Sequence, residues 1–232
     1  MKGLTAKNIL IIGASSGIGA EVADRLNQAG ANTITASRNA NANVLWDATD
    51  PAADLNPILP EELHGLVYCP GSINLKPFAR ISDEDFLNDF QLNVMGAIRA
   101  IRQAIPALKR SGNASVVLYS TVAAGQGMNF HASVATSKRA LEGLALSLAA
   151  EFAGSNVRFN VIAPSLTNTP LAAQLLSSPE KQEASAKRHP LGRIGHTDDM
   201  AGATLFLLSD DSAWMTGQIL AVDGGLSTIK SL

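Results

Sequence analysis

The segment from residue 8 to residue 19, NILIIGASSGIG, constrains the fold more than any other part of the chain. Residues 8–12 form an unbroken apolar run, which is typical of a parallel strand that is buried on both faces. Gly13, Gly17 and Gly19 follow directly, and behind them apolar residues recur at helical spacing. A strand, a glycine-rich turn and a helix in this order predict an α/β fold with a phosphate-binding turn.

This turn has a physical basis for binding a dinucleotide. Glycine permits a tight turn and a close approach between the backbone and a ligand. The N-terminus of the following helix presents free N–H groups and the positive end of the helix dipole, which suit a pyrophosphate. The spacing G-x-x-x-G-x-G by itself also fits a purely structural turn. Its place between a strand and a helix favours the dinucleotide.

Apolar runs of strand length alternate with helical patterns along the rest of the chain. This alternation predicts a doubly wound parallel sheet in a single domain over residues 1–232. The sequence RNANAN between Ser37 and Val44 is too short for an ordinary crossover, so the helix between strands 2 and 3 is expected to be shortened or lost. The further predicted strands are residues 33–36, 44–46 (a short edge strand or an irregular extension), 66–69, 115–119, 157–162 and 219–222.

Three later segments carry patterns that mark the start of a helix. The segment Ser82-Asp-Glu-Asp85 resembles a capping box. Behind it, apolar residues recur at three- and four-residue steps from Phe86 to Leu108, which predicts one long helix. Ser178-Pro-Glu and Thr197-Asp-Asp are expected to begin two more helices, because each places a cap residue before proline or acidic residues.

Composition narrows the classes of partner. The chain has 232 residues with a formal net charge of -2, which gives no reason to expect nucleic acid or an anionic membrane as a partner. The single cysteine, Cys69, excludes an internal disulfide and suits a reducing compartment. No apolar stretch reaches the ~20 residues that span a bilayer. We therefore expect a cytoplasmic protein.

The end of the second predicted strand indicates which dinucleotide is bound. An NAD site usually carries an acidic residue there, which accepts hydrogen bonds from the ribose 2′-hydroxyl. Here the stretch is Thr35-Ala-Ser37-Arg38, without an acidic residue. A serine and a guanidinium suit a 2′-phosphate, although Arg38 also fits an ordinary surface position. The sequence therefore favours NADP(H) over NAD(H).

Motifs along nearly the whole chain resemble those of the short-chain dehydrogenase/reductase family. The matching positions are Gly13-Ala-Ser-Ser-Gly-Ile-Gly19, Asp47-Ala48, Asn93, Ser120-Thr121, Lys138, Arg158-Phe-Asn-Val-Ile-Ala-Pro164, Phe206-Leu-Leu-Ser-Asp, Thr216-Gly-Gln and Val222-Asp-Gly-Gly225. The resemblance implies a Rossmann-like fold, a nicotinamide cofactor and a homodimer or homotetramer.

Position by position, the resemblance also implies a cofactor site. Asp47 and Ala48 would contact the adenine, and the segment Cys69-Pro70-Gly71 would lie under the nicotinamide ribose, although Pro70 offers no N–H donor. The loop that begins at Pro164 would hold the carboxamide. The expected cofactor-binding residues are Gly13, Ser15, Ser16, Gly17, Ile18, Gly19, Ser37, Arg38, Asp47, Ala48, Cys69, Pro70, Gly71, Lys138, Pro164, Ser165, Leu166, Thr167 and Thr169.

The position of the family's catalytic tyrosine holds Val134. In the family that tyrosine lies four residues before a lysine, here Lys138, and exchanges a proton with the substrate oxygen, whereas valine cannot titrate. The resemblance assigns the remaining catalytic positions to Lys138 and to Thr121 with Ser120 beside it. It also assigns one to Asn93, which would interrupt the long helix and hold a water near Lys138.

Other side chains are candidates to replace the tyrosine. A histidine side chain can exchange protons near neutral pH. His131 lies close to the expected helix start, so it fits either a proton donor or a loop residue. Ser133 has no evident activating base, and Tyr119 is expected to pack on its strand. Cys69 fits either a reactive thiol or a small buried residue. No cluster suggests a metal site. The remaining histidines are assigned to loops: His64, His189 and His196.

Two hypotheses on function follow. The first is an NADP(H)-dependent oxidoreductase that acts on a small carbonyl or an enone or enoyl substrate with a non-standard proton donor. The second is a catalytically weak or inactive NADP(H)-binding sensor or partner protein, which the valine favours. Residues 169–190 have helical character between prolines and are expected to form a lid over the substrate.

Overall fold

A computed structural model describes residues 1–39 and 42–230. Within these residues, seven parallel strands form one sheet in the order β3-β2-β1-β4-β5-β6-β7. The strand order reverses direction between β1 and β4, where α/β sheets bind ligands at the carboxyl ends of the strands. The predicted doubly wound, Rossmann-like sheet is confirmed. The strands are β1 (Asn8–Ile12), β2 (Asn32–Ser37), β3 (Val44–Leu45), β4 (Gly65–Tyr68), β5 (Ala114–Tyr119), β6 (Val157–Pro164) and β7 (Ile219–Val222).

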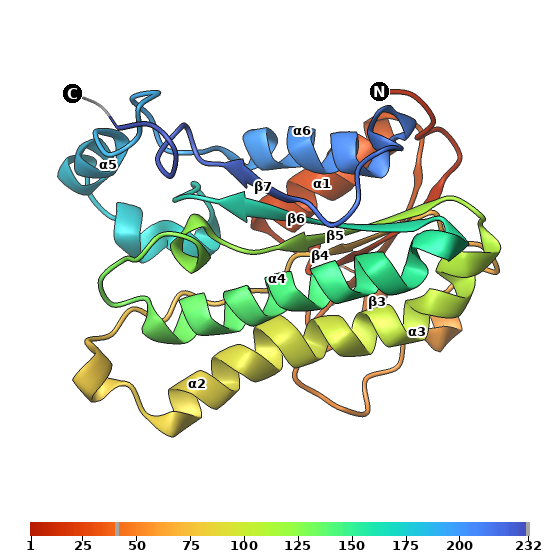
Figure 1. Cartoon of the computed structure of the whole chain (residues 1–232), viewed down its shortest axis with the longest axis horizontal. Coiled ribbons are helices and arrows are strands. Elements are labelled where there is room, and N and C mark those ends of the chain that lie inside the picture. The colour runs from red at the N-terminus through yellow and green to blue at the C-terminus, as the bar shows by residue number, and fades with distance from the viewer. Residues whose placement is uncertain (40–41, 231–232) are drawn as a thin grey trace.

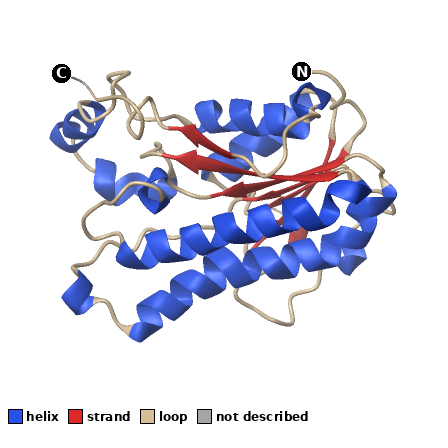
Figure 2. Ribbon diagram, in the orientation of Figure 1, coloured by secondary structure: helices blue, strands red, loops and turns tan. Residues whose placement is uncertain are grey.

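Helices cover both faces of the sheet. Figures 1 and 2 show α1 and α6 on one face and α2, α3 and α4 on the other. Each face has its own core of aliphatic residues, as the continuous apolar strands require. The helices are α1 (Gly17–Gln28), α2 (Asp83–Phe90), α3 (Gly96–Arg110), α4 (Ala132–Phe152), α5 (Pro179–Ala186) and α6 (Thr197–Leu208). Short 3-10 turns lie at η1 (Asn56–Ile58), η2 (Phe78–Arg80), η4 (Val122–Ala124), η5 (Ala153–Ser155), η6 (Pro170–Leu176) and η7 (Asp210–Ser212).

The turn between β1 and α1 requires its glycines. Gly13 and Gly17 have φ angles of +84° and +58°, which side chains of L-residues rarely adopt. A Cβ on Gly19 would lie 2.3 Å from the carbonyl oxygen of Gly13, well inside van der Waals contact. The turn therefore brings bare backbone to the N-terminus of α1, as the sequence predicted.

The crossover between β2 and β3 has lost its helix in the described residues. Val44 of β3 pairs with Ala36 of β2, which makes a short edge strand. Several predicted strand boundaries were wrong by one or two residues. β2 runs from Asn32 to Ser37 instead of 33–36, and β4 ends at Tyr68, so Cys69 lies in the loop that follows.

The long helix predicted from residue 83 onward is interrupted. The Ser82 capping box forms, because Ser82 Oγ accepts from the backbone N–H of Asp85 and the Asp85 carboxylate accepts from the N–H of Ser82. The segment η3 (Gln91–Met95) then adopts π-helical geometry before α3 begins. One extra residue in a turn changes which side chains face the sheet. The expectation of one uniform helix was wrong, and the interruption at Asn93 was correct.

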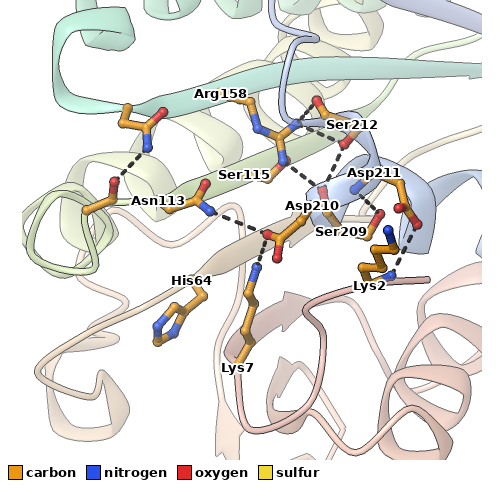
Figure 3. Close-up of polar contacts among 12 residues, drawn as sticks. Lys2, Lys7, His64, Asn113, Ser115, Arg158, Ser209, Asp210, Asp211 and Ser212 are labelled. Carbon is orange, nitrogen blue, oxygen red and sulfur yellow. Dashed lines mark hydrogen bonds and ion pairs between the residues drawn. The ribbon is translucent and has the colours of Figure 1, made fainter.

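A buried arginine fixes the opposite edge of the sheet, at the amino ends of the strands. Figure 3 shows the Arg158 guanidinium, from β6, directed at the turn that contains Ser209 and Ser212. It donates to the carbonyl oxygens of Ser212 and Leu207, each at 3.0 Å. Burial lowers the pKa of Arg158. Because the cluster lies at the far edge from the carboxyl ends, it serves stability and leaves that edge free.

The segment 169–190, predicted to be a lid, has the helical character expected of it. It contains η6 and α5, which lie beside the carboxyl ends of β6 and β7 (Figure 1). In the described part of the chain, no helix combines the length and the apolar character needed to cross a membrane.

Candidate functional site

Two cavities open at the carboxyl edge of the sheet. The turn cavity lies over the glycine turn, and the lysine cavity lies between β5, α4 and η6; each has a volume of about 340 Å³. Their walls share Ile18, Cys69, Gly71, Thr169 and Leu171, so they form one continuous cleft.

Every residue predicted to bind a cofactor lines this cleft. Those in the wall of the turn cavity are Gly13, Ser15, Ser16, Gly17, Ile18, Gly19, Ser37, Arg38, Asp47, Ala48, Cys69, Pro70 and Gly71. Those in the wall of the lysine cavity include Lys138, Pro164, Ser165, Leu166, Thr167 and Thr169. Residues from distant parts of the sequence therefore meet at one edge of the sheet, as the strand order requires.

The far end of the turn cavity contains the two residues predicted to distinguish the cofactors. Arg38 is exposed, and Ser37 is buried with its hydroxyl held in a local turn, since Ser37 Oγ donates to the carbonyl oxygen of Asn39 at 3.1 Å. Asp47 lies in the same wall, and hydrogen bonds from Thr49 lower the pKa of its carboxyl. Sequence reasoning missed the wall residues Asn39, Trp46 and Leu92.

Lys138 is the buried charge of the lysine cavity. It is 5% exposed, which excludes the alternative of an ordinary surface lysine. Its Nζ donates to the backbone carbonyl oxygen of Tyr119 at 2.7 Å. Burial lowers the pKa of Lys138 to about 8, while the charges of Cys69 and Asp89 act in the opposite direction. A Cβ on Gly71 would lie 3.4 Å from Nζ, so the glycine leaves the amine accessible from the cleft.

Asn93 lies in the π-helical turn, near the same glycine as this amine. Its amide nitrogen donates to Ser72 Oγ at 3.2 Å and to Ser137 Oγ at 3.1 Å. Its carbonyl oxygen Oδ1 is buried and has no hydrogen-bond partner among the described residues. A Cβ on Gly71 would lie 3.7 Å from that oxygen. Asn93 Oδ1 is therefore a free acceptor near Lys138, and it could accept a hydrogen bond from the water predicted there.

Val134 presents an apolar surface to the cavity one helical turn before Lys138. It is 6% exposed and lines the cavity. Thr121 also lines the cavity and caps η4, accepting from the N–H of Ala123 at 3.3 Å. Ser120 is engaged elsewhere, because its hydroxyl donates to Glu142 Oε1 at 2.6 Å. The prediction that groups Ser120 with Thr121 is therefore correct for position, but their hydroxyls have different partners.

His131 stands at the N-cap of α4 and also lines the lysine cavity. Its Nδ1 lies 2.7 Å from the carbonyl oxygen of Asn129. Tyr119 packs as predicted, with its hydroxyl at 2.5 Å from Thr204 Oγ1. Cys69 is half-buried in the wall shared by both cavities, and burial raises the pKa of its thiol to about 12.

One interaction contradicts a sequence-based assignment, and a second one was missed. Ser133 does have an activating base, because the Asp89 carboxylate accepts from Ser133 Oγ at 2.5 Å. The base was missed because it comes from α2 and not from the serine's own helix. His189 lies in the loop after α5, as predicted, but its side chain is buried, and its Nε2 lies 2.8 Å from Ser165 Oγ.

Comparisons with known proteins agree with this geometry. The family model described as "Enoyl-(Acyl carrier protein) reductase" matches residues 52–227, and the model described as "short chain dehydrogenase" matches residues 7–50. A tropinone reductase homolog of Arabidopsis thaliana is 30% identical over 246 residues, which cover 97% of this chain and 94% of that protein.

Two solved structures are similar over nearly the whole chain. The ligand-free aldohexose dehydrogenase of Thermoplasma acidophilum superimposes with a TM-score of 0.92 at 30% identity and covers 99% of this chain and 97% of its own. A candidate 2-deoxy-D-gluconate 3-dehydrogenase of Agrobacterium tumefaciens, with bound NADP, gives a TM-score of 0.88 at 28% identity and covers 97% of each chain.

Proposed function

The chain belongs to the short-chain dehydrogenase/reductase family, and on this premise we propose that it is an NADP(H)-dependent oxidoreductase whose proton donor is not the family's tyrosine. Its substrate is a small carbonyl compound or an enone or enoyl compound. The observation that carries the proposal is the placement of Lys138 and Asn93, which flank Gly71 in the cleft while Val134 occupies the position one turn away.

The residues of the cleft fit a nicotinamide dinucleotide. A Cβ at position 19 would lie 2.3 Å from the carbonyl oxygen of Gly13, so this turn can form only with glycine there. The turn can therefore bring its backbone close to a phosphate. The free N–H groups at the start of α1 would hold the pyrophosphate. Asp47 would meet the adenine, and the loop from Pro164 to Thr169 would hold the carboxamide. When bound, the cofactor supplies or accepts a hydride.

The preference for NADP(H) rests on Ser37 and Arg38. Both line the turn cavity, and the exposed Arg38 guanidinium can hold a 2′-phosphate with charge-assisted hydrogen bonds. The similar Agrobacterium structure with bound NADP supports the same preference.

Lys138 would bind the ribose and place a positive charge beside the reacting centre. Burial lowers the pKa of Lys138 to about 8. This value is still above 7, so most of the amine carries its proton at neutral pH. Thr121 would orient the substrate oxygen from the opposite wall. General acid catalysis is worth about a hundred- to ten-thousandfold, so loss of the tyrosine slows proton transfer without preventing hydride transfer.

A proton must still reach the substrate. For reduction of a conjugated C=C bond, the resulting enolate can take its proton from water, which the valine does not hinder. For carbonyl reduction, His131 and Thr121 are donors within the wall of the same cavity. These two reactions define the substrate classes to be tested first.

The second candidate function is an NADP(H)-binding protein without turnover, and Val134 is the observation that favours it. The two candidates differ in one measurement. NADPH consumption is followed with enones, quinones, aldehydes and ketones, while NADPH binding is measured separately. Consumption with any class supports the oxidoreductase. Tight binding without consumption across all classes overturns it in favour of the sensor.

We also propose that the protein forms a homodimer or homotetramer. Leu146 of α4 and Ile219 of β7 are exposed, and both line a surface hollow of about 200 Å³. Exposed aliphatic side chains on neighbouring elements suit a contact between copies. A monomeric mass in solution at micromolar concentration would contradict this.

A further inference from the structure

A carboxylate that the proposed mechanism does not use is buried beside the lysine cavity. Asp89, near the end of α2, is 4% exposed. Its Oδ1 accepts from Ser72 Oγ and its Oδ2 from Ser133 Oγ, each at 2.5 Å. Among the described residues, no ion pair includes Asp89. Burial of a carboxylate with hydroxyl partners alone is costly, so the group needs a reason beyond packing.

One of the two hydroxyls opens into the cavity. Ser72 lies in the cavity wall together with Val134 and Lys138, whereas Ser133 is buried behind that wall. Ser133 directly precedes Val134 in the chain, so one of the two serines that donate to the carboxylate adjoins the position that lacks the tyrosine.

The directions of the hydrogen bonds determine what Ser72 can offer a ligand. Its single proton points to the Asp89 carboxylate, and its oxygen accepts from Asn93 Nδ2 at 3.2 Å. A serine oxygen has two lone pairs, so one acceptor site remains. Ser72 therefore presents an acceptor to the cavity, and the group it can bind is a donor such as the hydroxyl of an alcohol.

We infer that Ser72 is a further catalytic residue, which accepts the hydroxyl proton of an alcohol substrate, and that Asp89 is the positioning residue that acts through it. This inference rests on the proposed oxidoreductase function. It assigns the alcohol–carbonyl pair as the substrate class and places the proton exchange on a serine–aspartate pair.

In alcohol oxidation, the substrate loses a hydride and a proton to different acceptors. The substrate C–H bond breaks, and its hydride, with two electrons, passes to the oxidised nicotinamide cofactor. The substrate O–H bond breaks, its proton moves to Ser72 Oγ, and the original Ser72 proton moves to Asp89 Oδ1. A carbonyl forms, the substrate is oxidised, the cofactor is reduced, and the Asp89 acid returns its proton to solvent after the product leaves. Carbonyl reduction follows the reverse path.

Charged groups from the packed elements bear on this carboxylate. From α4, the Lys138 ammonium faces Asp89, and the carboxylate opposes the effect of burial that lowers the pKa of Lys138. From α2 itself, Asp85 lies one turn earlier and is paired with Lys76 at 2.6 Å. Lys138 therefore places a positive charge near the carboxylate that accepts the proton.

The test compares three variants in the full-length protein. Ser72→Ala removes the acceptor in the cavity, and Asp89→Asn keeps the shape of the carboxylate but removes its ability to take a proton. Ser133→Ala is the matched control, since it removes the other hydroxyl from the same carboxylate without changing the cavity wall. NADP+-dependent oxidation of secondary alcohols and NADPH reduction of the matching ketones are measured with each protein, together with NADPH affinity.

We expect kcat to fall about a hundredfold in Ser72→Ala and in Asp89→Asn, with NADPH affinity retained. The loss in Ser133→Ala is expected to be at least about ten times smaller. For alcohol oxidation, the loss in Asp89→Asn is expected in kcat, with the KM for the alcohol unchanged. If Asp89→Asn does not fold, Ser72→Ala and Ser133→Ala still make the comparison.

The outcomes separate this inference from the proposed function. A wild-type protein that turns over alcohols or ketones, with equal losses in Ser72→Ala and Ser133→Ala, overturns the serine–aspartate pair and leaves the oxidoreductase standing. A wild type that reduces enones but neither oxidises alcohols nor reduces ketones also overturns the serine–aspartate pair and retains the oxidoreductase function. A wild type that binds NADPH and turns over nothing overturns both.

Discussion

The side-chain amine of Lys138 donates to the backbone carbonyl oxygen of Tyr119 at 2.7 Å. This contact ties α4 to the end of β5 and fixes the amine at the point where the two cavities join. Because the partner is a carbonyl and not a carboxylate, the positive charge remains available to a ligand. Its position beside Gly71 and Asn93 is the centre of the proposed site.

Replacement of Lys138 tests that charge. We expect Lys138→Met to weaken NADPH binding at pH 7 by about tenfold or more, because the hydrogen bond from the Lys138 ammonium to the cofactor ribose is lost. In the wild type, affinity for NADPH should fall as pH rises through about 8, where the lowered pKa of Lys138 removes its proton. Titration of NADPH by fluorescence between pH 6 and pH 10 measures both effects, and the variant should lack the step near 8. A wild type without that step would contradict the assignment of the amine.

Arg38 is expected to set the choice of cofactor. Arg38→Ala should weaken NADPH binding by about tenfold to a hundredfold, since charge-assisted hydrogen bonds to the 2′-phosphate are lost. Binding of NADH, which lacks that phosphate, should be unchanged. Dissociation constants for the two cofactors in wild type and variant give the answer. An equal loss for both would mean that Arg38 acts on the fold of the turn and not on the phosphate.

The glycine turn offers a prediction with a control elsewhere in the chain. Gly19→Ala would place a Cβ 2.3 Å from the Gly13 carbonyl oxygen, so the turn must open and cofactor binding should be lost. Gly143, in the exposed part of α4, has nothing within 4 Å of its Cβ position. Gly143→Ala should keep cofactor binding and raise the free energy of unfolding by about 0.5–1 kcal/mol. Thermal unfolding with and without NADPH distinguishes the two variants.

Much of this fold and of the cofactor wall could be predicted because the signals are local. An apolar run, a glycine triplet and a helix within one short segment placed β1, its turn and α1 correctly. The parallel order then brought Asp47, Gly71 and Thr169 to one edge without further information.

The remaining features depend on packing between distant segments. Asp89 faces Ser133 across two helices, and the π-helical turn at Asn93 decides which side of that helix faces the sheet. The spacing of residues within either helix does not show that Asp89 and Ser133 pair with each other. The contact between His189 and Ser165 was missed for the same reason, since the loop after α5 and the segment that follows β6 meet only in the folded chain.

The cluster at the amino ends of the strands should contribute stability without activity. Arg158→Met leaves several buried carbonyl oxygens without their donor, which costs about 2–4 kcal/mol of unfolding free energy. Arg110→Met is the comparison, because Arg110 is exposed and donates only to Glu61. Chemical denaturation should show a large loss for the first variant and a small one for the second. Equal losses would contradict the role given to the Arg158 cluster in Figure 3.

Restoring a phenol should reveal how complete the rest of the site is. Val134→Tyr places a hydroxyl one turn before Lys138, inside the same cavity wall. We expect reduction of ketones to rise by up to about a hundredfold, since a general acid is added next to a lysine that can lower its pKa. The control is Val134→Phe, which fills the same space without a hydroxyl. An equal change in the two variants would mean that size, and not proton transfer, limits the wild type.

The most direct test of the central claim is the fate of NADPH in the presence of the wild-type protein and a panel of enones, quinones, aldehydes and ketones. We predict that NADPH is oxidised in step with formation of the reduced product for at least one of these classes, and that Lys138→Met loses this activity. NADPH that binds to the wild type and stays intact with every compound would contradict an oxidoreductase.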